Sequence, residues 1–343
     1  MSQDEPKTQQ LDLFGGPPPA TALSRKQSSA SVAASTPDAN LIALGKALPA
    51  SVFLGTSSWS FPGWQGLVYA GAHTDAKLAR DGLAAYARHP LLKSVGIDRT
   101  FYAPIARADY ARYKNQVPES FRFLVKAPMA VTASYVRTEA GGFSDSPFYF
   151  DPHYTQDTFI EPCLAGLGDT AGALVFQFPP QGAAATREPD RWINRLYRFL
   201  QALPPGPLYG VEIRDAALLT PRFFTCLKTV GVTFCVASHA KMPSPEAQIV
   251  QMHEALGAGA FARAFIARWS LHAGFKYEDA KSRYAPFNQL VDEDLDSRAA
   301  LAGACLAAVE AACPAFVIIN NKAEGSAPLS IEKLAARITR QHG

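Results

Sequence analysis

Eight short apolar runs recur along the chain, and each is followed by turn residues and then by a longer stretch whose apolar positions have helical spacing. The runs are mostly continuous rather than alternating, which is typical of parallel strands covered on both faces. They lie at residues 51–58, 92–98, 121–127, 173–179, 208–214, 233–238, 264–270 and 315–321. Eight such units predict a closed (β/α)8 TIM barrel of the α/β class. The alternative is a doubly wound open sheet, but the chain has no dinucleotide-binding glycine fingerprint.

The helical patterns are clearest in three places. The stretch "PDRWINRLYRFLQAL" places four large apolar side chains on one helix face: Trp192, Leu196, Phe199 and Leu203. The stretch "DSRAALAGACLAAVEAA" predicts a second helix, with Asp296 or Ser297 as its N-cap. Asp38 is the expected N-cap of a short helix over "ANLIALGKAL".

The first 37 residues differ from the rest, because Pro, Ser, Ala and Gln dominate them. Such a segment buries too little apolar surface to offset the entropy of ordering, so we expect residues 1–37 to be a disordered tail. Residues 38–343 then form a single barrel domain. The tail nevertheless contains an apolar cluster, "QLDLF" at residues 10–14, which its own surroundings cannot bury.

Composition limits the function classes only loosely. The net charge of +3 neither indicates nor excludes nucleic acid, since a local basic patch is compatible with a balanced total. Five scattered cysteines without CxxC spacing indicate reduced thiols and a cytoplasmic protein. No apolar run is long enough to span a membrane and no secretory signal is visible, so we expect no membrane partner.

Polar residues begin where the predicted strands end, and the active site of a TIM barrel lies at that end. The catalytic candidates are Lys126, Glu212 and His272, and the ligand-binding candidates are Trp59, Tyr102, Arg214, Asn320, Asn321 and Lys322. Other polar residues in the same positions receive no role, among them Ser57, Gln177 and Arg268. We expect Lys126, Glu212, Arg214, His272 and Asn320 to converge there.

Each candidate has a functional and a structural interpretation. Lys126 could bind an anion or, once desolvated, act as a base or an imine-forming amine, but it could also pair with Glu212. Glu212 and Arg214 share one face of their strand, which allows a general base beside an anion-binding guanidinium or an internal salt bridge. We expect Glu212→Gln to abolish activity without unfolding the protein.

The remaining candidates suit ligand binding less specifically. Asn320, Asn321 and Lys322 offer amides and a cation for a phosphate or a sugar hydroxyl, or form a turn. Trp59 and Tyr102 could stack on a base or sugar, or cover the barrel. His239 and His272 with Glu212 and Asp98 could ligate a metal, but without HxH or HExxH spacing we expect none. No cofactor can be named.

Several motifs resemble one known family. They are "GTSSWSFPGWQGLVYA", "DRTFYAPIARADYARYKNQVPESFRFLVKAP", "LVFQFPP", "YGVEIRD" and "AFVIINNKAEGSAP", and they follow one another in the family's order. The chain thus resembles the bacterial YecE-like family, also called the domain of unknown function 72, over roughly residues 52–340. This resemblance implies a TIM barrel and no established reaction.

The apolar cluster in the tail resembles a second known motif. At Gln10, Leu11, Asp12, Leu13 and Phe14 the chain is similar to the pentapeptide by which bacterial replication and repair proteins bind the DNA polymerase sliding clamp. Leu13 and Phe14 would enter an apolar cleft, and Gln10 would hydrogen-bond at its rim. The alternatives are a chance match and a strap that packs on the protein's own barrel.

Two functions therefore stay open. The first is a clamp-tethered enzyme that processes DNA or damaged nucleotides. The second is a cytosolic enzyme or binder of a phosphorylated or sugar-like metabolite, and non-catalytic binding is a weaker third possibility. A basic face beside the barrel mouth would favour the first, and a small closed mouth would favour the second.

Overall fold

The computed structural model describes residues 31–137, 142–261, 263–272, 275 and 277–342. The clamp-like motif at residues 10–14 lies outside the described residues, as does most of the predicted disordered tail. Residues 32–35, which the sequence assigns to that tail, lie against the folded body. The Ser35 amide donates to Val68 O at 2.9 Å, and the Ala70 amide donates to Ala33 O at 3.0 Å. The folded body therefore begins near Val32 rather than at Asp38.

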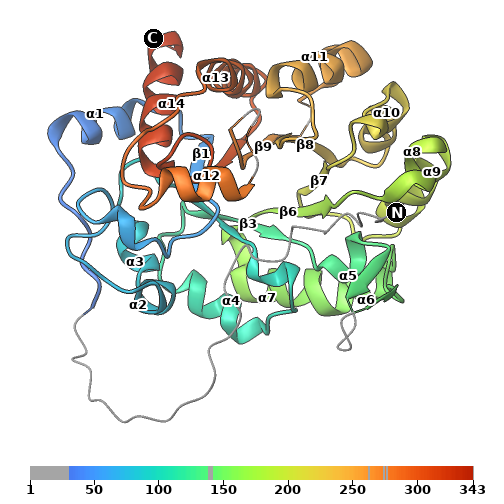
Figure 1. Ribbon diagram of the computed structural model, residues 1–343, viewed down its shortest axis with the longest axis horizontal. Coiled ribbons are helices and arrows are strands. Elements are labelled where there is room, and N and C mark those ends of the chain that lie inside the picture. The colour runs from blue at the N-terminus through green and yellow to red at the C-terminus, as the bar shows by residue number, and fades with distance from the viewer. Residues whose placement is uncertain (1–30, 138–141, 262, 273–274, 276, 343) are drawn as a thin grey trace, which may run out of the picture. The chain divides into compact units, whose positions relative to one another are not determined.

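Parallel strands close into a barrel that helices surround (Figure 1). Its eight strands follow the order β1-β10-β9-β8-β7-β6-β3-β2. This confirms the TIM-barrel prediction and excludes the open sheet. All eight predicted runs form strands: β1 (Val52–Thr56), β2 (Ser94–Ile97), β3 (Arg122–Lys126), β6 (Ala171–Phe178), β7 (Tyr209–Ile213), β8 (Thr233–Ser238), β9 (Phe265–Trp269) and β10 (Ala315–Ile319). The barrel closes through β1 and β10, where Val52 pairs with Ala315 and Thr56 pairs with Ile319.

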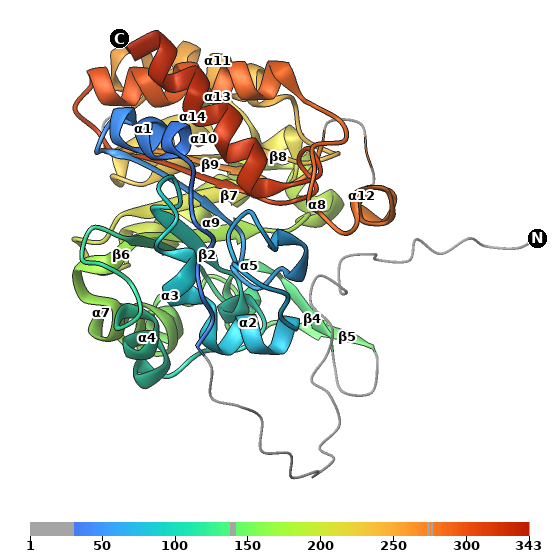
Figure 2. The same ribbon diagram turned by 90° about the vertical axis from the view of Figure 1, so that its left-hand side faces the viewer.

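Helices surround the barrel and connect its strands (Figure 2). The α-helices are α1 (Ala39–Ala47), α2 (Asp75–Asp81), α3 (Leu83–Tyr86), α4 (Arg107–Lys114), α5 (Met129–Thr132), α6 (Pro152–Thr155), α7 (Glu161–Leu167), α8 (Gly182–Arg187), α9 (Pro189–Gln201), α10 (Pro221–Thr229), α11 (Pro245–Leu256), α12 (Tyr277–Tyr284), α13 (Leu295–Glu310) and α14 (Ala327–His342). Short 3-10 turns are η1 (Pro62–Trp64), η2 (Arg99–Phe101), η4 (Gly168–Thr170), η5 (Ala216–Leu218) and η6 (Gly257–Gly259), and a π-turn is η3 (Gln156–Ile160).

The predicted helix signals hold with one change. The Asp38 carboxylate accepts from the Leu41 amide at 2.7 Å and caps α1 as expected. Trp192, Leu196 and Phe199 are buried on the inner face of α9. The N-cap of α13 is Asp294, whose carboxylate accepts from the Ser297 amide at 3.0 Å, rather than Asp296 or Ser297.

One element has no counterpart in the sequence prediction. The loop after β3 carries a small antiparallel hairpin of β4 (Tyr135–Arg137) and β5 (Phe143–Asp145). Figure 2 shows the hairpin and α12 projecting on the same side of the barrel. Because these segments follow β3 and β9, they belong to the carboxyl-terminal end of the strands, which is called the mouth below.

Small residues allow the strands to approach one another in the barrel wall. An added Cβ at Gly55 would lie 2.0 Å from Ser94 O, so no larger residue fits between β1 and β2 there. Inside the barrel, a separate apolar cluster fills the lower layers: Leu124, Ala173, Val175, Cys235, Ala264, Ile266, Phe316 and Ile318. The barrel is therefore a filled core below its mouth.

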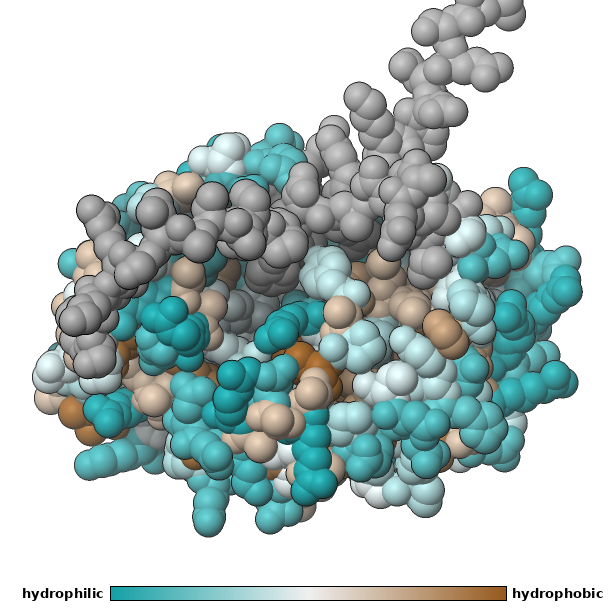
Figure 3. Space-filling model, turned by 90° about the horizontal axis from the view of Figure 1, so that it is seen from below, coloured by the Kyte–Doolittle hydropathy of each residue, from teal (hydrophilic) through white to brown (hydrophobic). Residues whose placement is uncertain are grey.

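The outer face at the bottom of Figure 1 is mainly hydrophilic, with small scattered apolar patches (Figure 3). No helix in the described part of the chain combines the length and the hydropathy that a membrane crossing requires.

Candidate functional site

Strand alternation creates a polar layer above the apolar interior of the barrel. Leu124, Val175 and Ile266 point into the barrel, so the residues two positions later, Lys126, Gln177 and Arg268, point the same way. Further members of this upper layer are Ser57, Asp98, Glu212 and Asn320. The seven side chains thus come from seven of the eight barrel strands or the residues that follow them.

Arg268 lies at the centre of this layer and joins three strands. Its Nη1 donates to Glu212 Oε2 at 2.9 Å and to Gln177 Oε1 at 3.2 Å. Its Nη2 donates to Asp98 Oδ2 at 2.8 Å and to Oδ1 at 3.1 Å. These two carboxylates hold the pKa of Arg268 above its usual range despite burial. Arg268 is therefore a permanent cation that fixes both carboxylates.

Arg214 forms the second part of the cluster. Its Nη2 makes an ion pair with Glu212 Oε1, so Glu212 lies between two guanidinium groups. Burial opposes the ionised form of Glu212, but the two arginines outweigh it and lower the pKa of the carboxyl. Arg214 is only 4% exposed, yet its Nε and Nη1 have no hydrogen-bond partner in the structure. Two buried, unused donors of a cation are costly unless something else accepts from them.

Lys126 has unusual surroundings for a lysine. Its Nζ lies 3.4 Å from the centroid of the Phe101 ring. It makes no ion pair or hydrogen bond with the residues that the structure describes. Burial is the main cause that lowers the pKa of Lys126 to about 7; Arg268 and Arg214 lower it further, whereas Asp98 and Glu212 raise it. The pairing with Glu212 that the sequence allowed is absent, because the arginines hold that carboxylate.

A second polar group lies on the other side of the mouth, where β10 meets β1. Asn320 Nδ2 donates to Ser57 Oγ at 2.8 Å, and Lys322 Nζ donates to Asn320 Oδ1 at 3.4 Å. Lys322 is 5% exposed and its ammonium lies 5.9 Å from the centroid of the Phe287 ring. Burial, followed by the charge of Lys281, lowers its pKa to about 8.

The histidines at the mouth are not arranged as metal ligands. Burial first, and then the charge of Arg214, lowers the pKa of His239 to about 4, so this ring is neutral at physiological pH. Glu212 and Asp98, the carboxylates that a metal site would use, are bound to arginines. Among the described residues, no three His, Cys, Asp or Glu side chains are grouped as a metal ion would require.

Some predicted site residues have mainly structural contacts. The Trp59 indole donates to Leu78 O at 3.1 Å, and this side chain is only 8% exposed. Asn321 Oδ1 accepts from the Trp64 indole at 3.1 Å and from the Ala327 amide at 2.9 Å, so it anchors the start of α14. Asn321 Nδ2 is buried without a hydrogen-bond partner, so the hydrogen bonds of this side chain are those of Oδ1 alone.

His272 and Tyr102 lie at the edge of the site. The His272 ring packs beside Phe275, with centroids 5.1 Å apart, and its amide donates to Lys322 O. No contact joins it to Glu212 or Lys126. Tyr102 is 45% exposed, and burial with the nearby charge of Asp98 raises the pKa of its hydroxyl. The structure therefore brings together Lys126, Glu212 and Arg214, with Asn320 and Lys322 across the mouth, and leaves His272 outside the cluster.

The sequence assigned no role to the residue that organises the cluster. Arg268 and Gln177 were visible only as polar strand ends, and Asp98 only as a possible metal ligand. Alternation could have placed Arg268 inside the barrel, because Ile266 is apolar and the next inward position carries a charge. Its partners could not be found in this way, since Asp98 is 170 residues distant in the chain.

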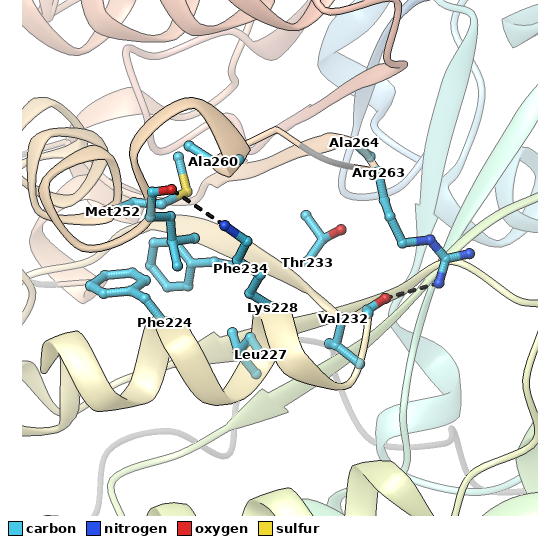
Figure 4. A pocket seen from close by; sticks show the side chains of 13 residues that line it. Phe224, Leu227, Lys228, Val232, Thr233, Phe234, Met252, Ala260, Arg263 and Ala264 are labelled. Atoms are coloured by element: carbon cyan, nitrogen blue, oxygen red, sulfur yellow. Dashed lines mark hydrogen bonds between the residues drawn. The ribbon is translucent and has the colours of Figure 1, made fainter.

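Two surface hollows lie at the opposite end of the barrel. The first, about 40 Å³, is lined by the start of β8 and by apolar side chains of α10 and α11, including Phe224, Leu227 and Met252 (Figure 4). The second, about 260 Å³, lies beside Tyr209 and Arg263. Both adjoin the amino ends of strands, where TIM barrels carry stability rather than catalysis.

Comparisons with known proteins agree with the fold. A crystal structure of a DUF72 family protein from Enterococcus faecalis V583 matches with a TM-score of 0.55 and 16% identity, covering 84% of this chain and 95% of that one. A second crystal structure of the Enterococcus faecalis protein matches with a TM-score of 0.51 and 15% identity, over 85% and 97% of the two chains. No curated protein matches the chain. The model of the family described as "Protein of unknown function DUF72" matches residues 53–343, so the chain belongs to the DUF72 family.

Proposed function

We propose that this protein is an enzyme that binds a small anionic metabolite, carrying a phosphate or a carboxylate, at the mouth of its barrel. The unused donors of Arg214 carry this proposal. Nε and Nη1 are buried and lack partners, and an anion is the group that accepts best from guanidinium donors. Arg214 and Arg268 face two carboxylates, and the protonated fraction of Lys126 adds a third positive charge, which one more negative group could compensate.

The burial of the cluster supports a small ligand. Glu212, Arg214, Lys126 and Arg268 are each at most 9% exposed. Groups that are so little exposed suit a small ligand better than a DNA duplex. The five free cysteines support a cytoplasmic location, since disulfides are rare there.

Lys126 supports catalysis rather than binding alone. An amine with a pKa of about 7 is partly neutral at physiological pH and can accept a proton, which an ordinary lysine does rarely. Asp98 and Glu212 are bound to Arg268, so they orient the charges around the amine rather than act on substrate themselves. Lys126 is therefore our candidate for the acid–base group, and Glu212 becomes a positioning residue.

Anion binding can be tested by calorimetry at neutral pH with inorganic phosphate, pyruvate and dihydroxyacetone phosphate. We expect saturable binding of at least one of them, weakened about tenfold or more in Arg214→Gln, because a charge-assisted hydrogen-bond pair is lost. The control is Arg222→Gln, which removes an exposed guanidinium that bonds Asn194 on the outer surface. The proposal fails if none of these anions binds, or if Arg214→Gln binds as well as wild type.

A second candidate function rests on the tail sequence. We also propose that "QLDLF" at residues 10–14 binds the DNA polymerase sliding clamp, which would tether an enzyme that processes DNA or damaged nucleotides. Three large apolar residues within four positions are unusual in a segment rich in Pro, Ser and Gln, and they need a partner to bury them. The composition of residues 15–31 suits a tether between this motif and the folded body.

The tail proposal needs its own experiment. A peptide of residues 6–18 should bind purified clamp with a dissociation constant on the order of micromolar. Replacing Leu13 and Phe14 by Ala should weaken binding about a hundredfold, because two apolar anchors are lost. Equal binding of both peptides would refute docking. A lower melting temperature of the full-length double variant would indicate a strap on the protein's own barrel.

A further inference from the structure

We propose that Lys126 forms an imine with its substrate, and that the substrate is a small aldehyde or ketone that also carries an anionic group. This inference rests on the proposed function, since the same mouth would bind the anionic group. It goes further by naming the reacting bond and the chemical class of the substrate.

The Lys126 amine has no ion pair or hydrogen bond with the described residues. A buried lysine normally pairs with a carboxylate, and two are nearby. Both are already bound: Asp98 and Glu212 accept from the Arg268 guanidinium at 2.8 and 2.9 Å. The Lys126 amine is left against the Phe101 ring, with no bond to the described residues to break before it attacks a carbonyl.

The position of Lys126 in the barrel also favours attack on a carbonyl. Lys126 is the last residue of β3, and Thr100 Oγ1 donates to its carbonyl, which fixes the backbone between β2 and β3. The side chain extends from a rigid strand into the mouth rather than from a mobile loop. A nucleophile held in this way loses little entropy when it reaches the bound carbonyl.

Charge also favours imine formation at Lys126. The amine is neutral in part at physiological pH because of burial and the two arginines, as an attacking nitrogen requires. The iminium that results is again a cation in this layer. An anionic group on the substrate, held by Arg214, would compensate that charge, so an anionic carbonyl compound fits better than a neutral one.

The chemistry balances without a further reactant. The nitrogen lone pair of Lys126 forms a bond to the carbonyl carbon, and the carbonyl π electrons move to oxygen. Both protons of the amine leave with that oxygen as one molecule of water, and an N=C double bond remains. A proton from solvent at the mouth then converts the imine into the iminium.

Lys322 is the obvious competitor at the same mouth. It is also buried with a lowered pKa, but its Nζ donates to Asn320 Oδ1 at 3.4 Å, and its pKa of about 8 leaves less neutral amine. Mapping of the modified lysine therefore distinguishes the two.

The test is reductive trapping of the full-length protein at pH 7. Wild type is incubated with sodium cyanoborohydride and pyruvate, dihydroxyacetone phosphate or acetone, and modified lysines are mapped by mass spectrometry. Hydride adds to the imine carbon and leaves a stable secondary amine. We expect modification at Lys126 with at least one anionic probe, at least tenfold less with acetone, and about tenfold less in Arg214→Gln.

Two variants complete the experiment. Lys126→Arg keeps a cation but cannot form the imine, and it should lose the adduct. Lys93→Arg is the control, because Lys93 is a half-buried lysine with a lowered pKa at the opposite end of the barrel. Adducts on Lys322 or surface lysines instead of Lys126 would overturn the inference. An absent adduct at Lys126 would also overturn it; if phosphate still binds in calorimetry, the proposed function stands without imine chemistry.

Discussion

Arg268 and Asp98 are 170 residues apart in the chain, yet one guanidinium nitrogen of Arg268 contacts both carboxylate oxygens of Asp98, at 2.8 and 3.1 Å. Arg268 lies in β9 and Asp98 directly follows β2. In the barrel, β10 and β1 lie between these two strands. The pair thus crosses the upper end of the barrel. It removes Asp98 as a direct partner for Lys126 and leaves that amine free, which is the feature from which the proposed chemistry follows.

Replacing Asp98 by Asn should lower the pKa of Lys126 below its wild-type value of about 7. Asp98 is the strongest of the charges that favour the ammonium form, and its loss leaves Arg268 and Arg214 less compensated. The shift can be measured as the pH dependence of Lys126 labelling by an amine reagent. In Arg214→Gln the pKa of Lys126 should rise instead, because Arg214 lowers it in wild type. A pKa shift of the same sign in both variants would contradict this account.

Glu212→Gln should destabilise the fold, contrary to the expectation from sequence that the fold stays intact. Glu212 is fully buried between Arg214 and Arg268, and its removal leaves Arg214 without its counter-charge and Arg268 with Asp98 alone. Breaking a buried pair in this way costs about 3–5 kcal/mol. Chemical denaturation of wild type and variant measures the difference, and a change below about 1 kcal/mol would show that Glu212 is not needed for stability.

Gly55→Ala should also be destabilising, because its Cβ would lie 2.0 Å from Ser94 O in the neighbouring strand. Moving backbone in the barrel wall should cost about 3 kcal/mol or more. The matched control is Gly303→Ala on α13, where nothing lies within 4 Å of the added Cβ. That exchange should stabilise the protein by about 0.5–1 kcal/mol. Equal melting temperatures for the two variants would contradict the close packing of β1 on β2.

The stability of the protein should depend on pH through Lys126. The pKa of its amine is about 7 in the folded state and 10.5 as the ordinary value, so between these values the unfolded chain binds one more proton. The contribution of Lys126 to the free energy of unfolding therefore rises as pH increases from about 7 to 10.5, and it is smallest below pH 7. Lys126→Met removes the penalty for a buried ammonium.

The advantage of Lys126→Met over wild type should thus be largest below pH 7. It should shrink by up to about 1.4 kcal/mol per pH unit as pH rises above 7. Urea denaturation of both proteins at several pH values measures this difference in the free energy of unfolding. A difference that does not change with pH would mean that Lys126 titrates near its ordinary value.

The fold was largely predictable because parallel strands covered on both faces are continuous apolar runs. The structure confirms each of the eight runs. The β4–β5 hairpin escaped prediction because its strands are only three residues each and depend on one another rather than on the barrel. The start of the folded body was also misplaced, since Val32 packs on the core through contacts with residues more than thirty positions away.

The sequence predicted where the candidate site lies, but not which of its side chains pair with one another. Alternation places Asn320 toward the mouth and turns Asn321 toward Trp64, so the two amides could have been separated from sequence alone. His272 lies three residues beyond β9, where the chain no longer alternates, and its position depends on contacts with the loop after β10. Asp98 and Glu212 both pair with Arg268 rather than with Lys126. This pairing arises only when the closed barrel brings residues from distant strands together.

The proposed chemistry depends on a Lys126 amine that has no ion pair or hydrogen bond among the described residues and is partly neutral near physiological pH. The most direct test of this requirement is the rate at which an amine-specific reagent labels Lys126 in the intact wild-type protein, followed by mass spectrometry across the neutral and alkaline pH range. We predict a labelling curve with its midpoint at about 7, well before the exposed lysines react. A midpoint at the ordinary lysine value of 10.5 would contradict the account, because a charged amine could serve neither as a base nor as an imine-forming group.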